Sequence, residues 1–236
     1  SWASGIVSAE NSPHGRNQES SSEAIAAYES MALFGKVMKG IFADNNEDLD
    51  GYEISELVED AGTLLMTTEV EAAHRYWHVW SSPNHHNYYP STYNKLVVGM
   101  LYETAASFQT WFAPYPLVSY GIQLLPLTPI AEERDNPEWA RLLYPIYQQS
   151  CKDAPDDFCV ENGWSIVQTG LCATASGKDC LEQALSIPPE VYETDGGMGN
   201  SLSNTIWFIA TRPTDSGSIT EILPSSNSIA SNGSDY

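Results

Sequence analysis

Residues 15–24 read Gly-Arg-Asn-Gln-Glu-Ser-Ser-Ser-Glu-Ala and set two carboxylates, Glu19 and Glu23, four positions apart. From Ala24 to Ile41 apolar residues recur at helical spacing, so the pattern predicts an amphipathic helix over residues 20–42. We expect Glu19 and Glu23 to lie in its first turns and to share one face. A Glu near a helix start also has a simpler explanation, because it complements the helix dipole and can complete a capping box.

Amide and hydroxyl groups surround the two carboxylates. Asn17 and Gln18 precede them, and three consecutive serines lie between them. Such groups suit the recognition of a sugar better than they suit a plain helix start on a protein surface. The stretch therefore predicts one side of a carbohydrate site as well as the beginning of a helix.

The rest of the chain is expected to be helical with long irregular connections. The expected helices cover residues 53–80, 91–112, 116–121, 136–148, 163–173, 177–185 and 202–211. No segment sustains an alternation of period two, so a large sheet is not expected. Residues 213–236 are rich in Ser, Asn and Gly and are expected to form a mobile tail.

Composition limits the kind of partner. The chain has 236 residues, of which 42% are hydrophobic, and no apolar run is long enough to cross a bilayer. Its formal charge of −21 would repel a phosphate backbone, whereas an uncharged polysaccharide is indifferent to charge. We therefore expect neither nucleic acid nor a membrane as a partner.

The four cysteines lie within one thirty-residue stretch, at Cys151, Cys159, Cys172 and Cys180. None belongs to a CxxC pair, so a metal site is poorly supported. Clustered cysteines in even number instead favour disulfides in an oxidising compartment. Three pairings are possible, of which the two short loops, Cys151 to Cys159 and Cys172 to Cys180, are the simplest; four reduced thiols are the alternative.

Two stretches could suggest a metal, and neither supports one well. Asn46-Glu47-Asp48-Leu49-Asp50-Gly51 opens like an EF-hand loop, but Leu57 stands where a bidentate Glu is needed. A polar turn before a helix explains the same residues; a calcium-responsive module would instead show a calcium-dependent thermal shift. The adjacent His85 and His86 have no carboxylate nearby and are expected to be loop residues. No metal or organic cofactor is predicted.

Four blocks of the sequence occur in the order of one known family. They are Ser-Trp-Ala-Ser-Gly at 1–5 with residues 15–24, Thr-Glu-Val-Glu-Ala-Ala-His-Arg-Tyr-Trp-His-Val at 68–79, residues 94–100 with Ala113-Pro114 and Tyr-Gly-Ile-Gln-Leu-Leu-Pro-Leu-Thr-Pro at 120–129, and residues 199–212 with Asn204-Thr205-Ile206-Trp207. Together they resemble glycoside hydrolase family 81, the endo-β-1,3-glucanases. The resemblance covers residues 1–212.

The resemblance implies an all-α fold in which residues 1–212 are the C-terminal portion of an (α/α)6 barrel, or toroid. In the family a β-sandwich domain and the earlier barrel helices precede this point. Because the chain opens at Ser1 inside a family block, we expect a fragment that needs the upstream portion of the same protein as its partner. The family's general acid is an upstream Asp, and no residue of this sequence matches it.

The implied function is endo-acting hydrolysis of β-1,3-glucan, laminarin-like or from cell walls, with inversion. Glu19 and Glu23 match the two family positions from which the base is drawn. We expect Glu19, kept ionised by the helix N-terminus, to be the base, and Glu23 to orient water or to be the base itself. Inversion needs two carboxyl groups roughly 6.5–9.5 Å apart on opposite faces of the scissile bond. Glu19 and Glu23 are expected to point the same way, so they would form only one side of the site. The alternative is a glucan-binding or structural protein without catalysis.

Sugar rings stack on aromatic side chains, which adds candidate contacts. The substrate-binding candidates are Asn17, Tyr28, Tyr76, Trp77 and His78. Tyr28 lies between two and three helical turns after Glu19 and is expected on the same helix face. Tyr76, Trp77 and His78 belong to the family-like block at 68–79. The family and the cysteines together predict a secreted, extracellular protein, with cell-wall association as a further option.

Overall fold

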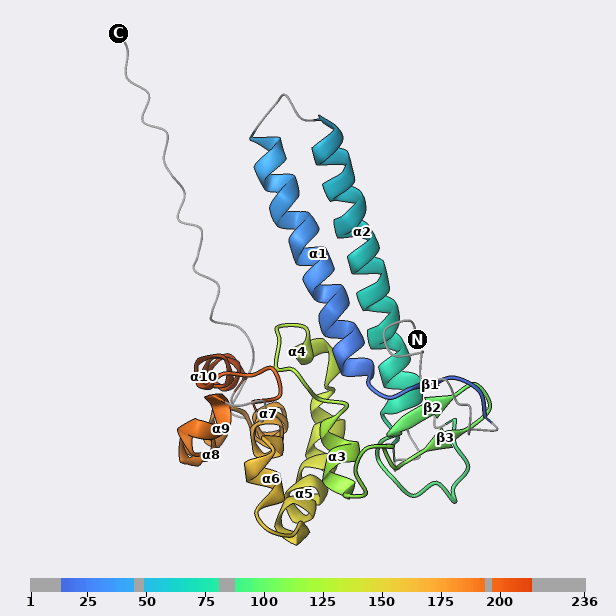
Figure 1. Ribbon diagram of the computed structural model, residues 1–236, viewed down its shortest axis with the longest axis vertical. Coiled ribbons are helices and arrows are strands. Elements are labelled where there is room, and N and C mark those ends of the chain that lie inside the picture. The colour runs from blue at the N-terminus through green and yellow to red at the C-terminus, as the bar shows by residue number, and fades with distance from the viewer. Residues whose placement is uncertain (1–13, 45–48, 81–87, 194–196, 214–236) are drawn as a thin grey trace.

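The computed structural model describes residues 14–44, 49–80, 88–193 and 197–213. A long helical hairpin stands on a body of shorter helices, with a small sheet beside its lower end (Figure 1). The expectation of a mainly helical chain with long irregular connections is confirmed.

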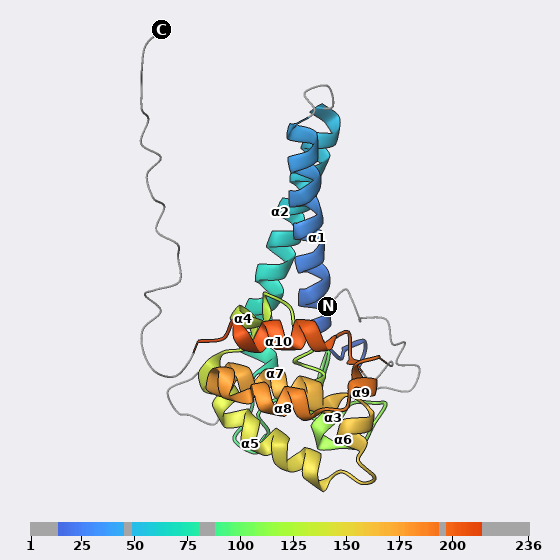
Figure 2. The same ribbon diagram turned by 90° about the vertical axis from the view of Figure 1, so that its left-hand side faces the viewer.

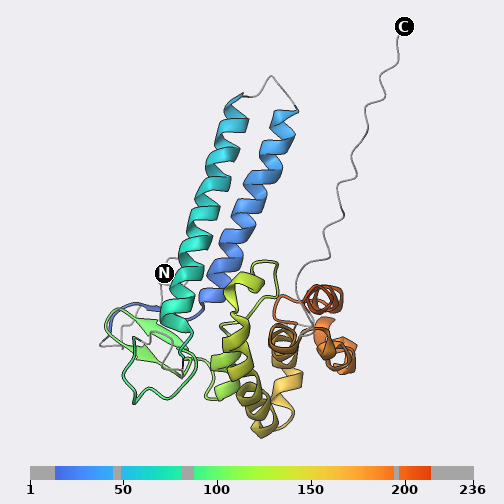
Figure 3. The same ribbon diagram turned by 180° about the vertical axis from the view of Figure 1, so that it is seen from behind.

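The hairpin consists of α1 (Ser21–Ala43) and α2 (Leu49–Ala72), which run side by side in Figures 1 and 3. Ser20 caps α1, since its Oγ accepts a hydrogen bond from the backbone N–H of Glu23 at 3.2 Å. The predicted helix over 53–80 begins earlier and ends earlier, because α2 passes into a π-helical turn, η1 (Ala73–Trp77).

Two glycines set the distance between the helices. A Cβ atom at Gly35 would collide with the backbone of Glu59, and one at Gly62 would collide with the backbone of Ala32. Backbone atoms cannot move aside as a flexible side chain can, so each position needs a residue without a side chain.

Gly35→Ala is therefore expected to destabilise the hairpin. The added methyl group should cost about 1–3 kcal/mol, as overpacking usually does, in spite of the better helix propensity of alanine. Gly40 has no atom within 4 Å of its would-be Cβ, so Gly40→Ala is the matched control and should be neutral or stabilising. Urea denaturation of the two variants measures the difference, and equal midpoints would contradict the packing described here.

Three short strands form an antiparallel sheet in the order β1 (Asn17–Gln18), β2 (Met100–Tyr102) and β3 (Ala106–Ser107). The predicted helix over 91–112 is therefore wrong. Its apolar run pairs with other segments instead: the N–H of Val98 donates to the carbonyl of Trp77 at 3.0 Å. Gly99 lies so close to the carbonyl of Phe108 that a Cβ atom there would collide with it.

The body is built around α7 (Trp164–Ser176), most of whose residues are buried. It packs between α5 (Pro137–Asp153) and α10 (Leu202–Ala210) (Figure 2). The remaining helices are short, and they are α3 (Pro116–Gly121), α4 (Ala131–Arg134), α6 (Phe158–Glu161), the 3-10 helix η2 (Gly177–Cys180), α8 (Leu181–Ser186) and α9 (Pro189–Glu193).

Two disulfides fasten neighbouring helices of the body, one linking α5 to α6 and the other linking α7 to η2. They join Cys151 to Cys159 and Cys172 to Cys180, so the simplest of the three predicted pairings is confirmed. Within the described ranges, no helix combines the length and the hydropathy that a membrane crossing requires. The first three residues of the EF-hand-like stretch, the pair His85-His86 and residues 214–236 lie outside the described residues.

Candidate active site

The segment that carries the two carboxylates is clamped to a buried loop. Ser20 and Ser22 both donate through Oγ to the carbonyl of Ile122, at 3.0 and 2.8 Å. Ser21 Oγ donates to Gln123 Oε1 at 3.1 Å, and Gln123 Nε2 donates to the backbone carbonyl of Glu19 at 2.7 Å. All three serines are buried, so their hydroxyls fix the backbone and do not face a ligand. Gln123, which the sequence analysis did not single out, is the centre of this clamp.

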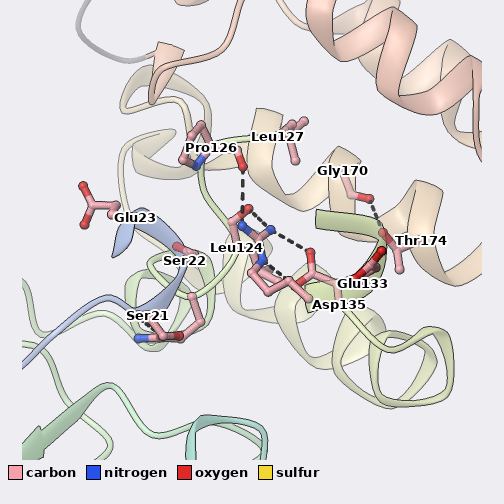
Figure 4. Close-up of polar contacts among 12 residues, drawn as sticks. Ser21, Ser22, Glu23, Leu124, Pro126, Leu127, Glu133, Asp135, Gly170 and Thr174 are labelled. Carbon is pink, nitrogen blue, oxygen red and sulfur yellow. Dashed lines mark hydrogen bonds and ion pairs between the residues drawn. The ribbon is translucent and has the colours of Figure 1, made fainter. Parts of the chain in front are cut away.

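Glu19 lies outside the helix. The backbone of Ser20 is extended, with φ −135° and ψ 108°, and α1 begins only at Ser21. The prediction that Glu19 and Glu23 share the first turns of one helix is therefore wrong, because the helix begins after the N-cap residue Ser20, which lies between them. Glu23 is exposed in the first turn, and Figure 4 shows its carboxylate pointing away from the buried segment of Leu124 to Leu127.

The carboxylate of Glu19 is half-buried, and its Oε1 atom has no hydrogen-bond partner among the described residues. Burial raises the pKa of Glu19 above its ordinary value, and the nearby charge of Glu23 raises it further. Hydrogen bonds from the side chain and backbone of Trp111 act in the opposite direction and lower this pKa. The helix N-terminus was expected to keep Glu19 ionised by lowering its pKa, but in the structure the pKa of Glu19 is raised. A raised pKa makes the carboxylate a stronger base once it is ionised.

Polar groups without partners extend the site along β1 and α1. Asn17 and Gln18 are buried on β1, and Gln18 Nε2 donates to the carboxylate of Glu69. Asn17 Oδ1 and the hydroxyl of Tyr28 are buried and have no hydrogen-bond partner among the described residues. Burial, and then the charge of Glu69, raise the pKa of Tyr28. Buried polar atoms are normally paired, so these unpaired ones indicate a place for a ligand or for water.

Glu69 is a site residue that the sequence analysis missed. It lies on α2, 51 residues beyond Gln18, and only the fold brings the two side chains together. The available signal was its place in the family-like block at 68–79, next to the aromatic residues that drew attention first.

The three neighbouring aromatic candidates, Tyr76, Trp77 and His78, differ in their exposure to solvent. Trp77 is 1% exposed and packs in the core with Ile25 and Val98. His78 is 2% exposed and stacks on Trp139 with ring centroids 3.7 Å apart, and burial lowers its pKa well below the ordinary range. The prediction that Trp77 and His78 contact a sugar is therefore wrong, since both rings belong to the core. Tyr76, at 41% exposure, keeps an accessible ring.

A metal has little support at this site. Within the described ranges, no three His, Cys, Asp or Glu side chains lie close enough together to hold an ion. What the site offers is one half-buried carboxylate, a second exposed one beside it, and unpartnered amide and phenol groups.

A half-buried carboxylate with a raised pKa, next to unpartnered hydrogen-bonding groups, is what the base side of a glycoside hydrolase site requires. The family model described as the glycosyl hydrolase family 81 C-terminal domain matches residues 1–209, so the chain belongs to glycosyl hydrolase family 81. The C-terminal domain of this family is an (α/α)6-type helical fold, as the resemblance implied.

Relatives and a solved structure agree with this assignment. A glucan endo-1,3-beta-D-glucosidase of Glycine max is 31% identical over 215 residues, which cover 90% of this chain and 28% of the relative. The protein of that name from Thermobifida fusca is 33% identical over 127 residues, covering 54% and 14%. A glycoside hydrolase family 81 structure from Clostridium thermocellum has the same fold, with a TM-score of 0.61 at 22% identity over 84% of this chain and 23% of that one. The chain thus spans 28% or less of the length of these proteins.

Proposed function

We propose that this chain is the base-side part of an endo-β-1,3-glucanase that cleaves its substrate with inversion. The activity named for the relatives supports the substrate class. The proposal rests on the carboxylate of Glu19, which is half-buried, has a raised pKa and carries an oxygen without a hydrogen-bond partner among the described residues. The backbone of Glu19 is held in place by the serine clamp, that is, the hydrogen bonds of Ser20–Ser22 and Glu19 to Ile122 and Gln123.

In an inverting reaction, a carboxylate removes a proton from water while the water attacks the anomeric carbon. A carboxylic acid on the other side of the bond protonates the leaving oxygen. Glu19 is proposed as the base, with Glu23 orienting the water or acting as the base itself. The acid is proposed to come from a portion of the protein beyond these 236 residues, which is supported by the small share of the relatives that the chain spans.

Three further side chains are proposed to contact the glucan. Asn17 Oδ1 and the hydroxyl of Tyr28 are buried without partners, so a sugar hydroxyl could satisfy each of them. The exposed ring of Tyr76 could stack on a sugar face.

The outer faces of the hairpin are proposed to bind the upstream portion of the same protein. Large apolar side chains are more than half exposed along both helices, at Leu33, Phe34, Val37, Ile41, Leu49, Ile54, Leu57 and Leu64. Burying one such side chain typically contributes about 1.5–3 kcal/mol, so this many exposed apolar side chains on two neighbouring helices favour a packed neighbour. Further helices of the same domain would supply it.

The protein is proposed to be secreted and to act outside the cell, where its substrate occurs in cell walls. The two disulfides support it, because disulfides persist in oxidising compartments.

Hydrolysis of laminarin by the complete polypeptide tests the proposal. Proton NMR of the first products should show new reducing ends in the α configuration, since inversion converts a β linkage to an α product. Binding of insoluble glucan with no release of reducing sugar would instead favour the non-catalytic alternative.

Glu23→Gln provides a test of which carboxylate is the base. If Glu19 is the base, activity is lost as the pH falls through its pKa. Removing the charge of Glu23 takes away one cause of the raised pKa, so the acid limb of the kcat/KM profile should move to lower pH. An acid limb that stays in place or moves to higher pH would contradict this reading. A loss of about 10²-fold or more in Glu23→Gln, together with a loss within about threefold in Glu19→Gln, would assign the base to Glu23.

A further inference from the structure

A cavity of about 460 Å³ lies beside the sheet, between η1, the segment from Tyr88 to Tyr93 and strands β2 and β3. We call it the tyrosine pocket, because its main lining residues are Tyr76, Tyr88, Tyr89, Tyr93 and Tyr102, with Glu103 at one side. Its volume falls within the range of about 300–1,000 Å³ that is usual for small-molecule sites.

Two of the tyrosines are fixed parts of the wall. The hydroxyl of Tyr89 donates to the carbonyl of Tyr76 at 2.6 Å, and that of Tyr93 donates to the carbonyl of Val97 at 2.8 Å. Their rings lie 5.1 Å apart, and burial raises the pKa of Tyr89 to about 12. These hydroxyls bond to the chain itself, so the two residues offer a ligand the apolar surfaces of their rings.

Two other tyrosines are largely open to solvent. Tyr76 is 41% and Tyr88 is 52% exposed, and their ring centroids lie 5.3 Å apart at an interplanar angle of 42°. The pair therefore presents a broad aromatic surface at the mouth of the pocket. Aromatic faces of this kind suit the C–H faces of sugar rings, and a phenol group adds a hydrogen-bonding edge.

Charge restricts the ligand further. Glu103 is an exposed carboxylate beside Tyr102, and the whole chain carries a formal charge of −21. An anionic ligand would be repelled, whereas a carboxylate can accept hydrogen bonds from the hydroxyls of a neutral sugar.

The pocket lies one strand away from the candidate base. Tyr102 pairs with Asn17 across β1 and β2, and Asn17 precedes Glu19 by two residues. The sheet stands beside the lower ends of α1 and α2 (Figure 1), and Glu19 lies in the short link between β1 and the start of α1. A polymer chain that reaches the carboxylates could therefore continue over the sheet.

We infer that the tyrosine pocket binds a stretch of uncharged β-glucan at a distance from the bond that is cut. The identity of the glucan as β-1,3-linked rests on the proposed function. The pocket would hold long substrates in register and contribute to their affinity without touching the reacting atoms.

The test compares binding and hydrolysis in a variant of the complete polypeptide that carries both Tyr76→Ala and Tyr88→Ala. Calorimetry with laminarin, carried out in a Glu19→Gln background that prevents cutting, should show a Kd raised roughly tenfold or more, equivalent to about 1.4 kcal/mol. In hydrolysis, the loss should appear chiefly as a raised KM for laminarin. The Phe versions at both positions keep the rings and lose only the hydroxyls, so they should lose much less affinity than the Ala versions.

Trp207→Ala is the matched control, since Trp207 is an aromatic residue of similar exposure, 43%, on the distant helix α10. An unchanged Kd in the double Ala variant, or an equal loss in the Trp207 control, would overturn the inference. Because binding is measured directly, a protein that binds laminarin through these tyrosines but does not hydrolyse it would keep the pocket and refute only the proposed catalysis.

Discussion

Glu19→Gln in the complete protein is expected to lower kcat for laminarin hydrolysis by about 10²–10⁴-fold, the usual contribution of a general base. Glutamine has nearly the same shape, but its amide cannot take a proton from the attacking water. The backbone carbonyl of Glu19 would keep its bond from Gln123, so the serine clamp should survive the change. Reducing-sugar release gives the rate, and binding to insoluble glucan shows whether affinity is kept.

Glu53→Gln is a suitable control, because Glu53 is an exposed carboxylate near the start of α2, at the far end of the hairpin. It should leave kcat unchanged. A Glu19→Gln protein with activity within about threefold of the wild type would remove Glu19 from the role of base, since so small a loss is far below that of acid–base catalysis.

Asp135→Ala is expected to cost the largest amount of stability, about 3–5 kcal/mol, as the loss of one partner from a buried ion pair usually does. Arg134 is fully buried and donates to both carboxylate oxygens of Asp135, at 2.8 and 2.7 Å. It also donates to the carbonyl of Leu124 at 2.6 Å. Without Asp135 the guanidinium would be left as an uncompensated charge in the core.

The control for this variant is Glu133→Ala, which removes an exposed carboxylate two residues away. Thermal denaturation should show a large fall in Tm for the Asp135 variant and almost none for the control. Similar Tm values in both variants would mean that the buried pair does not hold the Leu124 loop. That loop directly follows Ile122 and Gln123, which bind the serines of the candidate site, so a loss of activity should accompany the loss of stability.

The helical parts of the fold could be read from the sequence, because they depend on local periodicity. The helix predicted over residues 20–42 is observed at Ser21–Ala43, one residue away at each end. The two short disulfide loops were also the simplest pairing. The prediction of a helix over residues 91–112 was wrong, because Val97 and Val98 pair with residues 77–79. Such pairing is a tertiary contact that local periodicity does not reveal.

The candidate site was predicted in part. Its position around residues 15–24 followed from the residue types, but the serines were interpreted as sugar contacts, whereas each bonds to Ile122 or Gln123 about one hundred residues away. Trp77 and His78 had the right chemistry for a sugar site and the wrong burial. Helical periodicity alone cannot tell which face of a helix the rest of the protein covers.

Sodium azide as a substitute nucleophile tests most directly whether Glu19 is the base of an inverting enzyme. In a Glu19→Ala variant of the complete protein, the anion can enter the space left by the carboxylate and attack the anomeric carbon without needing a base. The account predicts a glucosyl azide product in the α configuration, together with a partial return of activity. No azide product from this variant, with an α-azide from Glu23→Ala instead, would contradict it.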